Sequence, residues 1–132
     1  MKTLTAKKVY AVGMGPFPAS EIACMIVEPF QGEGGFIPAP IEWVKAVRKI
    51  CDDNGILMIA DEVQCGNCRT GKYFASEYWK EAGAAPDIIT TAKSLGAGLP
   101  ISAITARIKR SVKRIADKQT IEQKSRFTAD EQ

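Results

Sequence analysis

Short apolar runs recur along the middle of the sequence, and they restrict the folds that the chain can adopt. IACMIVEP (22–29) and ILMIADEV (56–63) have the length and composition of strands that are buried on both faces. DIITTAK (87–93) predicts a third short strand, and ISAITAR (101–107), with its β-branched residues, a fourth. The chain therefore carries the strands of a small sheet.

Helical segments separate these strands. Residues 41–53 place apolar side chains at helical spacing with Lys and Arg between them, and Asn54-Gly55 is a pair suited to a left-handed cap. Residues 72–83 predict a second helix, whereas residues 30–40 form a glycine-rich loop. Strands that alternate with helices indicate an α/β fold, here part of a doubly wound, mostly parallel sheet.

The two ends of the chain differ from this central part. Residues 1–20 are mixed and finish in the turn-rich piece GMGPFPAS, which predicts an irregular N-terminal segment. Residues 108–132 predict a charged helix that runs into a polar tail. We expect residues 21–107 to form the α/β core.

Composition excludes several classes of protein. The net charge of +3 is mild, and the basic cluster at 107–114 indicates a solvated helix face or tail rather than a nucleic-acid site. No apolar run is long enough to span a membrane, and no signal peptide is evident. Four cysteines without secretory context predict reduced thiols in a cytoplasmic protein. Histidine is absent, which excludes His-dependent nucleophilic catalysis and His-ligated zinc, and we predict no metal site.

Polar side chains stand at the ends of three predicted strands. Glu28 closes the first strand, residues 61–64 close the second, and Lys93 closes the third. Parallel α/β sheets place their sites at the carboxyl ends of the strands, so these groups should converge. This convergence is the main functional signal in the residues themselves.

A lysine at the end of a buried strand has two interpretations. Near apolar walls, desolvation lowers a lysine pKa, and the neutral amine then attacks carbonyls, for example the aldehyde of a cofactor. Asp61 at the neighbouring strand end could then hold a pyridinium N–H. In the alternative, Lys93 and Asp61 form only a structural ion pair.

The cysteines have functional and structural interpretations. Cys65 and Cys68 form a CxxC motif, which permits a thioredoxin-like redox protein, but this motif usually opens a helix beside an aromatic residue or proline. Cys24 lies inside an apolar strand and Cys51 near a helix end, and we expect both to be core or near-core thiols.

Three blocks of the sequence together resemble one family. IVEPFQGEGGFIPAP (26–40), ILMIADEVQCGNCRTGKYFASEYW (56–79) and DIITTAKSLGAGLPISAITAR (87–107) resemble the class III aminotransferases, fold-type I enzymes that use pyridoxal 5'-phosphate. This family includes the 4-aminobutyrate and ornithine transaminases. The resemblance implies the large domain of that fold and a ping-pong transfer of an amino group from an amine or ω-amino acid to 2-oxoglutarate or another oxo acid.

The resemblance also implies roles for five residues. Lys93 matches the lysine that forms the internal aldimine and moves the proton, and Asp61 matches the aspartate that pairs with the pyridine nitrogen. Val63 matches the residue on the ring face, and Gln64 the amide near the phenolic oxygen. Glu28 matches a glutamate that faces the substrate.

The chain departs from the family in extent and in one loop. The family's phosphate-binding loop and small C-terminal domain have no counterpart here, so we expect a central piece of a homodimeric transaminase. In the alternative, the chain is a non-catalytic α/β fragment or assembly module. Where the family usually reads DEVQTGFGRTG, Cys65, Asn67 and Cys68 replace a Thr, an aromatic residue and a Gly. The loss of glycine at position 68 predicts strain in a tight loop.

Overall fold

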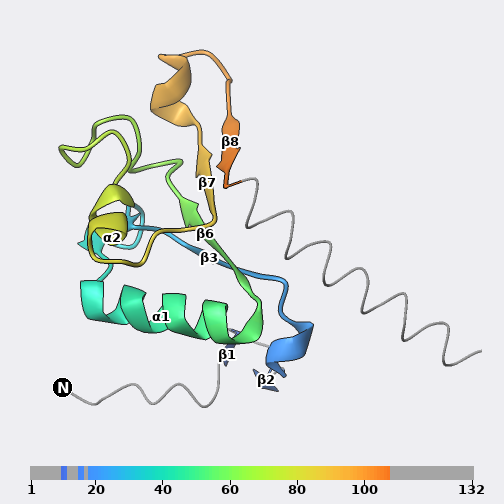
Figure 1. Cartoon of the computed structure of the whole chain (residues 1–132). Coiled ribbons are helices and arrows are strands. Elements are labelled where there is room, and N and C mark those ends of the chain that lie inside the picture. The colour runs from blue at the N-terminus through green and yellow to red at the C-terminus, as the bar shows by residue number, and fades with distance from the viewer. Residues whose placement is uncertain (1–9, 12–14, 17, 108–132) are drawn as a thin grey trace, which may run out of the picture.

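A four-stranded sheet forms the centre of the structure, a computed structural model that describes residues 10–11, 15–16 and 18–107 (Figure 1). The strand order is β3-β6-β7-β8, with β3–β6 and β6–β7 parallel and β7–β8 antiparallel. The predicted α/β fold with a mostly parallel sheet is thus confirmed. The strands are β3 (Cys24–Val27), β6 (Leu57–Asp61), β7 (Ile88–Thr91) and β8 (Ala103–Ala106).

Two short antiparallel pairs accompany the sheet. β1 (Tyr10–Ala11) pairs with β2 (Gly15–Pro16), and β4 (Phe30–Gln31) pairs with β5 (Ile37–Pro38). The predicted glycine-rich loop 30–40 is therefore a hairpin. A 3₁₀ turn, η1 (Ala19–Glu21), precedes β3.

Helix α1 (Ile41–Asn54) forms where the sequence predicts it. Pro40 stands at its N-cap, and Gly55 ends it in the left-handed conformation with φ +66°. Helix α2 (Glu77–Glu81) is much shorter than expected, and the prediction of a helix over 72–83 was wrong for residues 72–76 and 82–83. There the backbone N–H groups of Ala75 and Ser76 bond to the Glu62 carboxylate and not within a helix.

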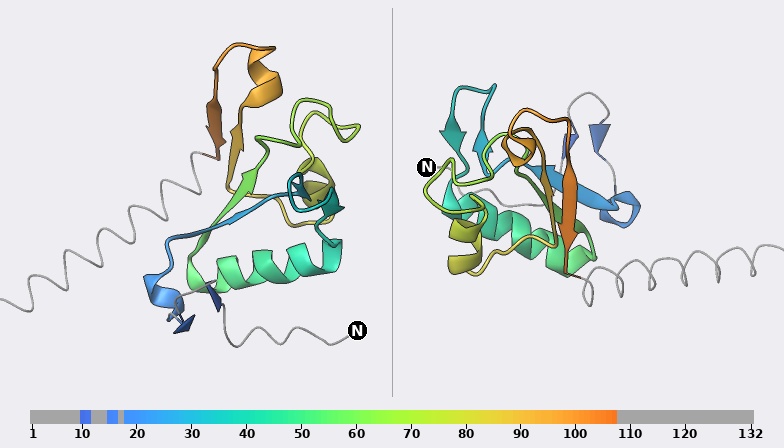
Figure 2. Two further views of the ribbon diagram at one scale, coloured as in Figure 1. Left: turned by 180° about the vertical axis from the view of Figure 1, so that it is seen from behind. Right: turned by 90° about the horizontal axis from the view of Figure 1, so that it is seen from above.

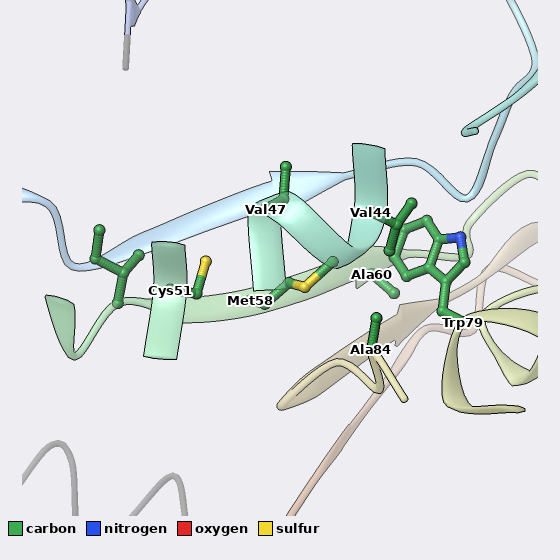
Figure 3. Packing of buried hydrophobic residues seen from close by; sticks show 8 residues of the cluster. Val44, Val47, Cys51, Met58, Ala60, Trp79 and Ala84 are labelled. Carbon is green, nitrogen blue, oxygen red and sulfur yellow. The ribbon is translucent and has the colours of Figure 1, made fainter. Parts of the chain in front are cut away.

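The hydrophobic core lies between the two helices and one face of the sheet (Figure 3). Strand β6 directs alternate side chains, Met58 and Ala60, to this face. Trp79 of α2 packs against the same cluster, and Trp43 is partly buried beside it. The fully or almost fully buried members are Val44, Val47, Cys51, Ile56, Met58, Ala60, Trp79 and Ala84.

A buried ion pair ties α1 to the start of β7. Arg48 Nη1 lies 2.8 Å from Asp87 Oδ2, and both side chains are almost completely buried. The same Asp87 oxygen accepts the N–H of Met58 at 2.9 Å. Arg48 also bonds to Asp52, one turn further along α1. These bonds satisfy charges that would be costly to bury alone.

The opposite face of the sheet is open in the part of the chain that the structure describes. Ile26 on β3 is 64% exposed and Ile104 on β8 is 74% exposed. The prediction that strand 22–29 is buried on both faces was therefore wrong, and so was the core position of Cys24, which is exposed. Cys51 is buried as predicted. The cause is the strand alternation, since within β3 only Met25 and Val27 pack against the core.

None of the helices in the described ranges is long and apolar enough to span a membrane. The charged tail predicted for residues 108–132 lies outside the described residues.

Candidate functional site

The predicted site residues gather at the carboxyl edge of β6 and β7. Asp61 is the last residue of β6 and pairs with Thr90 of β7, so the two strand ends are neighbours. Lys93 does not close β7 itself but opens the 3₁₀ turn η2 (Lys93–Gly96) that follows it. Its Nζ donates a hydrogen bond to Oε1 of Gln64. The predicted convergence of these two residues is thus present.

A cavity of about 430 Å³ opens beside this contact. Three segments enclose it: the β4–β5 hairpin, the loop after β6 and the turn η2, which lie together at the strand ends in Figure 2, right. Its floor and walls combine two aromatic rings with basic and polar groups. The lining residues are Phe30, Gly32, Phe36, Gln64, Cys65, Arg69, Thr70 and Lys93.

Asp61 lies at the same edge but outside this lining. In the strand alternation its side chain falls on the open face of the sheet, opposite to Ala60. Asp61 Oδ1 accepts the N–H of Val63 at 3.0 Å, which closes a local turn. Its second carboxylate oxygen has no hydrogen-bond partner among the described residues and is available to a donor.

Glu28 is engaged locally. Its Oε2 accepts the N–H of Gly32 at 3.1 Å, and the residue is exposed. This bond shapes the approach to the β4–β5 hairpin. Neither Glu28 nor Val63 lines the cavity.

Lys93 has an unusual backbone conformation. Its φ is +42°, in the left-handed region that residues with a Cβ rarely adopt. Such conformations persist where the surroundings hold them, and they concentrate at functional sites. The residue is exposed, so the described part of the chain does not enclose its side chain.

Glu62, the neighbour of Asp61, is completely buried on the covered side. Its carboxylate accepts the N–H groups of Ala75 at 3.0 Å and Ser76 at 2.6 Å, and the thiol of Cys65 at 3.2 Å. Glu62 therefore has a structural role and anchors the loop that follows β6. Its partners in the described residues are backbone amides and a thiol.

Burial, together with the charge of Glu62 and the hydrogen bond to it, raises the pKa of the Cys65 thiol to about 12. A redox CxxC motif needs a thiolate at neutral pH. Cys65 and Cys68 are both free, the first buried and the second exposed. The structure therefore argues against the thioredoxin-like interpretation.

The loop after β6 contains two residues whose backbone conformation favours glycine. Asn67 and Cys68 both have positive φ, +57° and +66°. Asparagine tolerates this region better than cysteine does. The predicted strain at position 68 is confirmed.

Sequence reasoning missed three residues at this site. Arg69 and Thr70 line the cavity, and the Thr70 hydroxyl is buried without a hydrogen-bond partner in the described residues. Asn67 Nδ2 contacts the hydroxyls of Thr91 and Ser94 beside Lys93. In the sequence, the only sign of a role for these three residues is that they closely follow the ADEVQ segment. Their contact with η2 depends on the fold.

Known proteins give a consistent identification. The sequence profile of the family Aminotransferase class-III matches residues 5–119. The chain belongs to the class III aminotransferases. This family uses pyridoxal phosphate, and solved aminotransferase structures share the mostly parallel α/β fold described above.

Individual relatives support this assignment. The chain is 52% identical to the 5-aminovalerate aminotransferase DavT of Pseudomonas putida over 66% of this chain and 20% of that protein. It is 43% identical to the acetylornithine aminotransferase of Caldanaerobacter subterraneus over 83% of this chain and 32% of that protein. The chain thus spans between 20% and 32% of the length of these two curated relatives.

Solved structures agree with the sequence relatives. A structure of Plasmodium falciparum ornithine δ-aminotransferase aligns with a TM-score of 0.58 and 41% identity, covering 64% of this chain and 22% of that one. A structure of Toxoplasma gondii ornithine aminotransferase aligns with the same TM-score of 0.58 and 40% identity, covering 66% of this chain and 20% of that one. The latter is described with partial occupancy of PLP at its active site.

Proposed function

We propose that this chain provides the cofactor-binding part of a pyridoxal-phosphate-dependent transaminase. The observation that carries the proposal is the contact between Lys93 and Gln64 at the edge of a 430 Å³ cavity, at the carboxyl ends of parallel strands. Ligands of open α/β sheets bind at this edge. The family assignment supplies the reaction class.

The functional groups at this edge of the sheet fit pyridoxal phosphate. Lys93 offers an amine for an aldehyde, Asp61 offers a free carboxylate oxygen for a ring N–H, and Gln64 offers an amide beside the cavity. Arg69 adds a cationic side chain to the cavity lining. Pyridoxal phosphate, when bound, supplies a carbonyl and an electron-withdrawing ring for chemistry at the amino carbon.

Each residue has a proposed role. The Lys93 amine would hold the cofactor through its aldehyde and would take and return a proton at the amino-bearing carbon, as a general acid–base. Asp61 would accept the ring N–H, Val63 would pack on the ring, and Gln64 would lie beside the phenolic oxygen. Glu28 contacts the substrate. These roles are supported by matching motif positions and, for Lys93 and Gln64, by their contact.

The proposed substrates are an amine or ω-amino acid donor, such as 4-aminobutyrate, and an oxo acid acceptor, such as 2-oxoglutarate. We further propose that the protein acts in the cytoplasm as a homo-oligomer. The acetylornithine, ornithine and 5-aminovalerate names of the relatives support a donor with a terminal amino group.

Cofactor attachment tests the proposal. We expect pyridoxal phosphate to produce an absorbance band near the visible edge with the wild-type chain, and borohydride treatment to fix the cofactor mass on the peptide that contains Lys93. Lys93→Ala should abolish both signals. Lys45→Ala is the matched control, since Lys45 is an exposed lysine on α1, and it should behave like the wild type. Identical signals from Lys93→Ala and wild type would refute the proposal.

A second function is favoured by one observation, the open sheet face that carries Ile26 and Ile104. Exposed apolar surface of this kind promotes association. A non-catalytic α/β module would bind other chains through this face without attaching the cofactor. It predicts concentration-dependent sedimentation together with no borohydride-stable adduct at Lys93.

A further inference from the structure

The loop after β6 contacts the turn that carries Lys93 at a second point, through the side chain of Asn67. Asn67 Nδ2 lies 3.2 Å from Thr91 Oγ1 and 3.2 Å from Ser94 Oγ. A carboxamide nitrogen has two hydrogens, so both bonds can form at once. Thr91 and Ser94 stand on either side of Lys93 in the sequence. The amide of Asn67 therefore joins the last residue of β7 to the second residue of η2.

Close packing holds the donor in place. A Cβ at Gly66 would lie 2.7 Å from the Glu62 carbonyl oxygen and 3.5 Å from Thr91 Oγ1, so the loop backbone runs directly against β7. Thr91 is only 4% exposed, which limits its movement. The positive φ of Asn67 points its short side chain back toward the turn without the penalty that a larger residue would have.

The segment that accepts these hydrogen bonds has a strained backbone. Lys93 has a strained backbone, with φ +42°, and its amine donates to Gln64, which belongs to the same loop as Asn67. One loop thus contacts both the amine of Lys93 and the side-chain hydroxyls of Thr91 and Ser94 on either side of it. We infer that Asn67 is a positioning residue, whose carboxamide fixes the segment 91–94 so that the Lys93 amine stays against Gln64.

This inference rests on the proposed role of Lys93 and extends it to a residue outside the expected cofactor contacts. Position 67 is one of those at which the chain departs from the usual motif of the family. The contact is made by an amide that an aromatic side chain could not replace. A purely structural bond would stabilise the loop but leave the reactivity of Lys93 unchanged.

Competitive labelling of lysines separates these two roles without cofactor. The full chain is treated with a trace of acetic anhydride, and mass spectrometry gives the ratio of acetylation at Lys93 to that at Lys45. We expect Asn67→Ala to raise this ratio at least about threefold, the effect of one lost neutral hydrogen bond on an equilibrium. The reason is that a released turn lets the amine leave Gln64 for solvent.

Two further variants complete the experiment. Ser94→Ala removes one acceptor of the Asn67 amide and should raise the ratio in the same direction, which decides the matter if Asn67→Ala does not fold. Asn54→Ala is the matched control, because Asn54 donates its amide to the Ile50 carbonyl at 2.9 Å at the distant end of α1. This control should leave the ratio unchanged.

The outcomes distinguish the inference from the proposed function. A raised ratio in the folded Asn67 or Ser94 variant supports the inference even if the wild type attaches no pyridoxal phosphate, in which case the proposed function fails alone. An unchanged ratio in folded Asn67→Ala, with lowered thermal stability, shows a purely structural bond and overturns the inference.

Discussion

The covered and the open face of the central sheet are built from alternate residues of the same strands, yet their surroundings differ. On the covered face Met58 and Ala60 meet α1 and α2 and are completely buried. On the open face Ile26 and Ile104 contact little in the described part of the chain. Alternate residues of one strand thus face either an apolar core or solvent. Most of the hydrophobic contribution to stability must therefore come from the covered face.

The adjacent carboxylates at the end of β6 show the same contrast in a functional setting. Glu62 points to the covered side, where two backbone amides and a thiol occupy it. Asp61 points to the open side. Among the residues that the structure describes, one of its carboxylate oxygens has no partner and is free to bind a ligand. The sheet alternation therefore separates an anchoring carboxylate from one that is available to bind a ligand.

The largest expected effect is at the centre of the covered face. Trp79→Ala should lower the free energy of unfolding by about 3–5 kcal/mol, because it removes a large buried side chain and leaves a cavity. Urea denaturation followed by circular dichroism measures this change. Trp43→Ala, at a partly buried position, should cost clearly less. Equal losses would show that the core is not centred between α1, α2 and β6.

Breaking the buried ion pair between Arg48 and Asp87 should lower the free energy of unfolding by a similar amount. Asp87→Ala leaves Arg48 without its main buried partner and should cost about 3–5 kcal/mol in urea denaturation. Asp53→Ala breaks an exposed pair with Lys49 and should cost less than about 1 kcal/mol. A small effect at Asp87 would mean that water reaches the pair.

The Cys65 thiol tests how closed the covered side is near the site. Its pKa is raised to about 12 in the folded chain from 9.0, so the folded state retains a proton that the unfolded state loses. Stability from this group is therefore complete below pH 9 and falls as the pH rises toward 12. The loss has an upper limit of about 1.4 kcal/mol per pH unit.

Urea denaturation at several pH values measures this dependence as the difference between wild type and Cys65→Ala. Cys24→Ala, at an exposed cysteine, is the control and should reproduce the wild-type dependence. If Cys65→Ala shows the wild-type slope above pH 9, solvent reaches the thiol and the covered side is looser than described.

A gain of stability is expected in the strained loop. Cys68→Gly should raise the free energy of unfolding by about 0.5–1 kcal/mol, because glycine adopts positive φ without the Cβ penalty and the exposed cysteine has little packing to lose. Thermal denaturation measures the gain. The same substitution at Cys24, in an extended strand, should instead destabilise the chain.

The smallest effect on stability belongs to the open face. Ile26→Thr should change the free energy of unfolding by less than about 0.5 kcal/mol, as expected for an exposed strand position. Met25→Thr, on the adjacent residue that packs against the core, should cost clearly more. A large loss at Ile26 would show that another part of the chain covers this face.

Much of the architecture could be predicted before any coordinates. Strand and helix positions followed from apolar runs and helical spacing, and Gly55 marked the end of α1 where it is found. Lys93, Asp61 and Gln64 were expected at one edge because parallel strands align their carboxyl ends. Burial was harder to predict, since Cys24 and Ile26 have the same apolar character as core residues but are exposed.

By itself, the sequence determined the α/β class, the family and the strand-end residues of the site, because these depend on local periodicity and on motifs read along the chain. Only the tertiary structure decided which side of the sheet is covered, that Glu62 anchors a loop while Asp61 stays free, and that Asn67 bonds on both sides of Lys93. These facts depend on contacts between residues far apart in the sequence. The physical reason is that strand pairing and helix packing, which join distant segments, fix the distance and orientation of each side chain.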